Sequence, residues 1–109
     1  MDYQVIEAQQ NATIFLSGEL DMLVGEKIGR LIREVGERND TLSLDFRQVT
    51  FVDSAGIGSL FFTTKDLLSL GKQVEIVNIL EEILDILRVL GFTDALGVEI
   101  KSLDNSPGI

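Results

Sequence analysis

Phe51-Val52-Asp53-Ser54-Ala55-Gly56-Ile57-Gly58 is the stretch of this 109-residue sequence that says most about its fold. An irregular strand-like segment over 48–52 leads into it, and apolar residues at helical spacing follow it as far as Leu68. The stretch therefore joins a strand to a helix, and Asp53 or Ser54 can accept a hydrogen bond from the first free N–H groups of that helix. Ser54 is expected to lie exposed at the positive end of the helix dipole, because the small residues after it leave the helix start bare.

Upstream of this stretch, the pattern predicts a hairpin followed by a helix. Strand-like runs at 3–7 and 12–17 are separated by polar residues, among which Asn11 suits a turn. Gly18-Glu19-Leu20-Asp21 is expected to break the second strand, and Asp21 is a candidate N-cap for the helix. Residues 22–38 form that amphipathic helix, and two of its three glycines are expected to mark close packing against a sheet.

The rest of the chain continues the alternation of strands and helices. Apolar alternation over 41–46 predicts a strand with one buried face, which continues irregularly from 48 to 52. After the helix that begins near Ile57, Gly71 is a typical stop. A short strand, another helix and a last edge strand are expected at 74–77, 80–90 and 98–100.

These elements predict an α/β fold in a single domain. The sheet is expected to be mixed, with four to five strands and a parallel section, and to be flanked by three to four helices. The domain is expected to span residues 1–103, with residues 104–109 as a flexible C-terminal tail. In such sheets functional groups gather at the carboxyl ends of strands, which here are the segments 18–21 and 52–58.

Composition excludes several classes of function. The sequence contains no cysteine and no histidine, which removes thiolate nucleophiles and the commonest metal ligand, so neither a metal nor a cofactor is expected. The formal charge of −9, with scattered basic residues, argues against nucleic-acid binding. No apolar run reaches the roughly 20 residues of a membrane span. The start of the chain lacks the features of a signal peptide, so a cytoplasmic location is expected.

Three interpretations of Ser54 remain open on the residues alone. A phosphate at a helix start adds about −1.5 to −2 charges yet suits the free N–H groups there, which is the profile of a switch. Alternatively, Asp53-Ser54 is only a helix cap. A serine enzyme is the poorest interpretation, because no histidine could activate the hydroxyl and the stretch is not a Gly-x-Ser-x-Gly elbow. It is not a phosphate-binding glycine loop either, and no enzymatic activity is expected.

Leu44-Asp45-Phe46, Val49, the stretch 51–58 and Leu60 together resemble the phosphorylation-site signature of the STAS domain family. The closest branch is that of the bacterial anti-sigma factor antagonists. Gly18-Glu19-Leu20-Asp21 resembles the turn before the first helix of the family, and Leu90-Gly91-Phe92 resembles the segment after its third helix.

This resemblance implies a switch in transcription regulation. The unphosphorylated protein would bind an anti-sigma factor and free a sigma factor, and the anti-sigma factor would itself be a serine kinase that phosphorylates Ser54. A separate phosphatase would reset the switch. The partner-binding residues implied by the resemblance are Asp21, Asp53, Ser54, Ala55, Gly56, Ile57 and Gly58. The alternative within the family is a non-switching STAS subunit of a stress-signalling or transport complex.

Overall fold

A computed structural model describes residues 1–102 of the chain, so the expected domain end at residue 103 and the expected tail at 104–109 lie outside the described residues. The helices and strands follow one another as β1 (Asp2–Ala8), β2 (Asn11–Leu20), α1 (Met22–Glu37), β3 (Thr41–Val52), α2 (Ser54–Ser69), β4 (Gln73–Ile79), α3 (Glu81–Val89), α4 (Phe92–Leu96) and β5 (Glu99–Ser102). No helix among these residues is long and apolar enough to cross a membrane.

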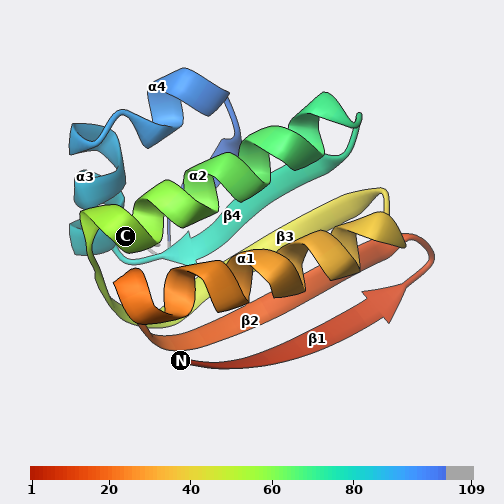
Figure 1. Cartoon of the computed structure of the whole chain (residues 1–109), viewed down its shortest axis with the longest axis horizontal. Coiled ribbons are helices and arrows are strands. Elements are labelled where there is room, and N and C mark those ends of the chain that lie inside the picture. The colour runs from red at the N-terminus through yellow and green to blue at the C-terminus, as the bar shows by residue number, and fades with distance from the viewer. Residues whose placement is uncertain (103–109) are drawn as a thin grey trace, which may run out of the picture.

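The five strands form one mixed sheet in the order β1-β2-β3-β4-β5. β1 runs antiparallel to β2, and the other three neighbouring pairs are parallel. In Figure 1, α1 and α2 lie side by side across one face of this sheet, and α3 and α4 lie near the start of α2. The expected α/β domain with a mixed sheet and a parallel section is therefore confirmed, at the upper expected count of five strands and four helices.

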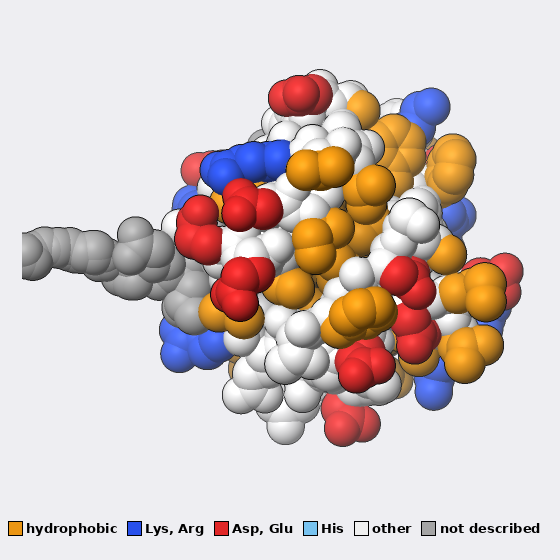
Figure 2. All heavy atoms as spheres, turned by 90° about the vertical axis from the view of Figure 1, so that its left-hand side faces the viewer, with side chains coloured by type: hydrophobic (Ala, Val, Ile, Leu, Met, Phe, Trp, Pro, Cys, Tyr) orange, Lys and Arg blue, Asp and Glu red, His pale blue; other side chains and the backbone are white. Residues whose placement is uncertain are grey.

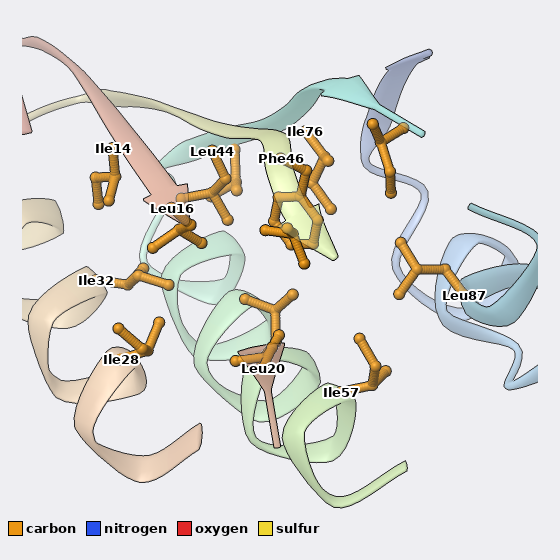
Figure 3. Close-up of a cluster of buried hydrophobic side chains, with 14 of the residues drawn as sticks. Ile14, Leu16, Leu20, Ile28, Ile32, Leu44, Phe46, Ile57, Ile76 and Leu87 are labelled. Carbon is orange, nitrogen blue, oxygen red and sulfur yellow. The ribbon is translucent and has the colours of Figure 1, made fainter. Parts of the chain in front are cut away.

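The core lies between the sheet and its helices. Alternate residues of β2 and β3 point to the helices, as the period of a strand requires, and they meet apolar side chains spaced three or four residues apart on α1. Figure 3 shows Leu16 and Phe46 from the strands, Ile32 from α1, Ile57 from α2 and Leu87 from α3 directed into this common core.

The hairpin is confirmed, but its turn is not where Asn11 suggested. Gln9 and Gln10 form the turn, at φ of 54° and 69°, and Asn11 is already paired with Ala8 in the ladder. Asn11 supports the turn from the strand, because its side-chain amide donates to the carbonyl of Gln9 at 3.2 Å.

The expectation that Gly18 begins a strand break is wrong. β2 continues to Leu20, and Gly18 takes a φ of +111° where the pairing with β3 shifts register. β3 is likewise one strand of twelve residues, because a second register shift after Phe15 absorbs its irregular part. The two shifts leave Leu20 and Val52 paired at the carboxyl ends of the strands, so that α1 and α2 begin side by side.

The glycines of α1 mark close packing, but their neighbour is α2 and not the sheet. A Cβ added at any of the three would come within 3 Å of an α2 side chain. The three close contacts are Gly25 with Ser59 Oγ at 2.9 Å, Gly29 with Thr63 Oγ1 at 2.7 Å and Gly36 with Leu67 Cδ2 at 2.7 Å. The two helices can therefore lie against each other over most of their length only because α1 has no side chain at these positions.

Candidate functional site

Asp21 and Asp53 each follow the last residue of a parallel strand and each cap the next helix. Asp21 Oδ1 accepts hydrogen bonds from the N–H groups of Leu23 at 3.0 Å and Val24 at 3.2 Å. Asp53 Oδ1 accepts one from the N–H of Gly56 at 2.7 Å. The structure thus selects Asp53, rather than Ser54, as the cap of α2.

The second carboxylate oxygen of Asp53 joins the two helix starts. Asp53 Oδ2 accepts from the N–H of Met22, the first residue of α1, at 3.3 Å. One carboxylate therefore stabilises free N–H groups at the starts of two helices, and the two residues that it joins, Met22 and Asp53, are 31 residues apart in sequence. The backbone supports the same junction, because the N–H of Asp53 donates to the carbonyl of Leu20 at 3.2 Å.

Gly56 allows this junction to close. A Cβ at residue 56 would lie 2.2 Å from the carbonyl oxygen of Leu20, which is a severe steric clash. Gly58, one residue after Ile57, has nothing within 4 Å of such a Cβ. The two glycines of the motif therefore differ in function: Gly56 permits close approach of β2, whereas Gly58 leaves open space on α2.

Ser54 is the first residue of α2 and is exposed, as expected, and so is Ala55. The expectation of a wholly bare helix start does not hold, because Gly56 and Ile57 are buried and Gly58 is half-buried. Ile57 is only 3% exposed and belongs to the core. Seven residues were expected to contact a partner. Of these, the buried Gly56 and Ile57 can act only by holding the others in place.

The surface around this site is acidic and apolar. No lysine or arginine occurs from Gly18 to Glu26 or from Thr50 to Thr64, whereas these segments contain four carboxylates. Figure 2 shows the side of the molecule on which α1 and α2 begin, with hydrophobic side chains spread among acidic ones. Among residues 1–102, no three or more acidic side chains are grouped so that they could hold a metal ion.

Two residues of this surface were missed by the sequence analysis. Met22 and Leu23, in the first turn of α1, are 68% and 83% exposed. The sequence contained an indication of their exposure, because both residues are apolar but fall outside the helical spacing that begins at Val24. Helical periodicity identifies which residues face the core, but it gives no reason to single out apolar residues that do not.

Glu7 and Arg38 form a charged contact away from this site. Arg38 Nε and Nη2 donate to the two carboxylate oxygens of Glu7, at 2.9 and 3.0 Å. These hydrogen bonds, and then one from Asn39, hold the pKa of Glu7 below its ordinary value. The cluster ties β1 to the end of α1 and is structural.

Comparison with known proteins supports the resemblance seen in the sequence. The family model described as "STAS domain" matches residues 3–104. None of the curated proteins matches the chain.

Three solved structures illustrate the range of similar folds, and all are too distant in sequence to indicate more than the fold. The phosphorylated form of the Bacillus cell fate determinant SpoIIAA has a TM-score of 0.67 and 21% identity, over 85% of this chain and 86% of that one. An anti-sigma factor antagonist from Mycobacterium paratuberculosis has a TM-score of 0.76 and 19% identity, over 90% and 84%. A sulfate transporter family protein from Wolinella succinogenes has a TM-score of 0.76 and 15% identity, over 88% and 80%.

Proposed function

The chain belongs to the STAS domain family, and we propose that it acts in transcription regulation as an anti-sigma factor antagonist that phosphorylation of Ser54 switches off. The observation that carries the proposal is the place of Ser54, an exposed hydroxyl on the first residue of α2. The unphosphorylated chain binds an anti-sigma factor and so releases a sigma factor. The chain has no catalytic role in this scheme, and Ser54 is the substrate of a kinase site in the partner.

The fold can accept a phosphate at Ser54 without rearrangement. Asp53 already occupies the N–H of Gly56, but the N–H groups of Ser54 and Ala55 have no acceptor within the helix. A phosphate on Ser54 can use these donors and the positive end of the α2 dipole. Stability is therefore expected to change little on modification.

Binding is expected to change much more than stability. A kinase that transfers phosphate to Ser54 must bring the phosphates of its own nucleotide next to this hydroxyl. Once Ser54 carries about −1.5 to −2 charges, those phosphates and the phosphoserine repel each other across the contact. Loss of the anti-sigma factor follows, and a phosphatase that hydrolyses phosphorylated Ser54 restores binding.

The test is phosphate transfer to one named residue. The chain is incubated with ATP, magnesium and each kinase-type anti-sigma factor of the organism that produces it, and the modified residue is mapped by mass spectrometry. Ser54→Ala should abolish the modification. Ser69→Ala is the matched control, because Ser69 is also exposed on α2 but at its other end, where its hydroxyl donates to the carbonyl of Asp66. Modification elsewhere, or none with any of these kinases, would contradict the proposal.

A non-switching STAS subunit is the second candidate. Its support is the similarity to a sulfate transporter family protein, which equals that to the Mycobacterium antagonist in TM-score. A neighbouring transporter gene and an unmodified Ser54 in cells would favour it over the switch.

A further inference from the structure

We infer that the exposed apolar pair Met22–Leu23 anchors the anti-sigma factor on this chain, and that the matching surface of the anti-sigma factor is an apolar pocket bordered by lysine or arginine side chains. The inference rests on the proposed function and adds to it the contact residues and the chemistry of the partner. It assigns recognition to the start of α1 and modification to the start of α2.

Both side chains of the pair are exposed to solvent. Single exposed apolar residues are ordinary on protein surfaces, but Met22 and Leu23 are adjacent and are 68% and 83% exposed. Neither side chain belongs to the core, whose contribution from α1 begins with the partly buried Val24. Both are therefore free to enter a pocket on another protein without disturbing the fold.

The pair is also held in place before any partner arrives. The N–H of Met22 donates to Asp53 Oδ2, and the N–H of Leu23 donates to Asp21 Oδ1. Because Asp53 immediately precedes Ser54, the same carboxylate fixes the apolar pair relative to the hydroxyl that is modified. Such preorganisation lowers the entropic cost of binding.

This geometry changes the role of the two aspartates. Both oxygens of Asp53 and one oxygen of Asp21 are used by backbone N–H groups of this chain. They are therefore positioning residues, which present Met22, Leu23 and Ser54 to the partner.

The acidic charge around the pair indicates which side chains border the partner's pocket. Glu19 and Glu26 are exposed and flank the pair in the sequence, and the nearest basic residue along α1 is Lys27, one turn beyond Leu23. The chain as a whole has a formal charge of −9. A pocket bordered by basic side chains complements this surface and speeds association, whereas an acidic border would be repelled.

A single introduced thiol tests the anchor, because the chain contains no cysteine. Leu23→Cys and Leu70→Cys are each labelled with a photoactivatable benzophenone maleimide and irradiated in an extract of the cells that produce the chain. Leu70 is the matched control, being 71% exposed at the far end of α2. The expected result is that position 23, and not position 70, captures a protein that binds a sigma factor. Equal capture at both positions, capture of a second copy of this chain alone, or capture of a protein that binds no sigma factor would overturn the inference.

Affinity measurements with the captured protein complete the test. Leu23→Ser should weaken binding about tenfold to a hundredfold, the range expected from leaving a leucine unburied, while Leu70→Ser should change it less than twofold. Added salt should slow association. Failure of the anchor and failure of the switch are distinguishable. Unchanged binding by Leu23→Ser, with Ser54 still phosphorylated, refutes the anchor alone. Normal binding through Leu23 without modification of Ser54 refutes the switch alone.

Discussion

The carboxylate of Asp53 accepts a hydrogen bond from the backbone N–H of Met22 at 3.3 Å, across 31 residues of sequence, while its other oxygen caps α2 at Gly56. The starts of both helices therefore depend on one side chain. Because Ser54 follows Asp53 in the chain and Leu23 follows Met22, the hydroxyl proposed for modification and the side chain proposed for recognition are fixed relative to each other.

Asp53→Asn should separate the two roles of this carboxylate, which are to cap α2 and to accept a hydrogen bond from Met22. The asparagine oxygen can still cap α2, but its amide nitrogen cannot accept from the N–H of Met22. We expect a loss of about 0.5–1.5 kcal/mol in the free energy of unfolding, measured by urea denaturation, and faster hydrogen exchange at the amide of Met22. Asp53→Ala also removes the cap and should cost about 1 kcal/mol more. Equal stability of the two variants would show that the contact with Met22 carries the whole effect.

Gly56→Ala should be strongly destabilising, whereas Gly58→Ala should not. The added Cβ at residue 56 meets the carbonyl of Leu20 at 2.2 Å, so β2 and α2 must move apart at a cost of at least about 2 kcal/mol. The same atom at residue 58 meets nothing within 4 Å, and the better helix propensity of alanine should add up to about 1 kcal/mol. Thermal unfolding of the pair measures both effects. A similar melting temperature for the two variants would contradict the close approach at Gly56.

Ser54→Asp should reduce binding of the anti-sigma factor at least about tenfold while changing the melting temperature by less than about 5 °C. A carboxylate on the first residue of α2 suits the helix dipole, so the fold is unaffected, but it brings negative charge to the proposed contact. Titration calorimetry and thermal unfolding measure the two quantities. Ser69→Asp, at the far end of α2, is the control and should leave binding unchanged. Undiminished binding by Ser54→Asp would mean that charge at this residue is not the switch.

The Glu7–Arg38 contact should make stability depend on pH in the acidic range. The pKa of Glu7 is lowered, chiefly by the hydrogen bond from Arg38, so folding favours its ionised form. The stabilisation is complete above the ordinary pKa of 4.5 and is lost as the pH falls through the lowered value. Glu7→Gln should therefore destabilise the chain at pH 7 and have little effect at pH 2. The same loss at both values would show that the contact acts through packing and not through charge.

Much of the fold could be predicted from local pattern. Hydrophobic periodicity identified the helices of residues 22–38 and 57–68 and the strands around them, because a helix and a strand bury their apolar residues at different intervals. The ends of β2 and β3 could not be predicted in this way. From the local sequence, Gly18 is expected to end the strand. Only the pairing with β3 shows that β2 shifts register there and continues.

The candidate site, like the fold, could be predicted only in part from the sequence. The sequence by itself determined that Asp53-Ser54 begins a helix and that small residues follow, because capping and backbone freedom are properties of neighbouring residues. The tertiary structure decided which of those residues are accessible: Ser54 and Ala55 are exposed, while Gly56 lies against the carbonyl of Leu20 and Ile57 lies in the core. It also decided that Asp53 reaches Met22, a contact between the ends of two paired strands. The register between paired strands sets the distance between such residues, and this register cannot be inferred from the local sequence around either residue.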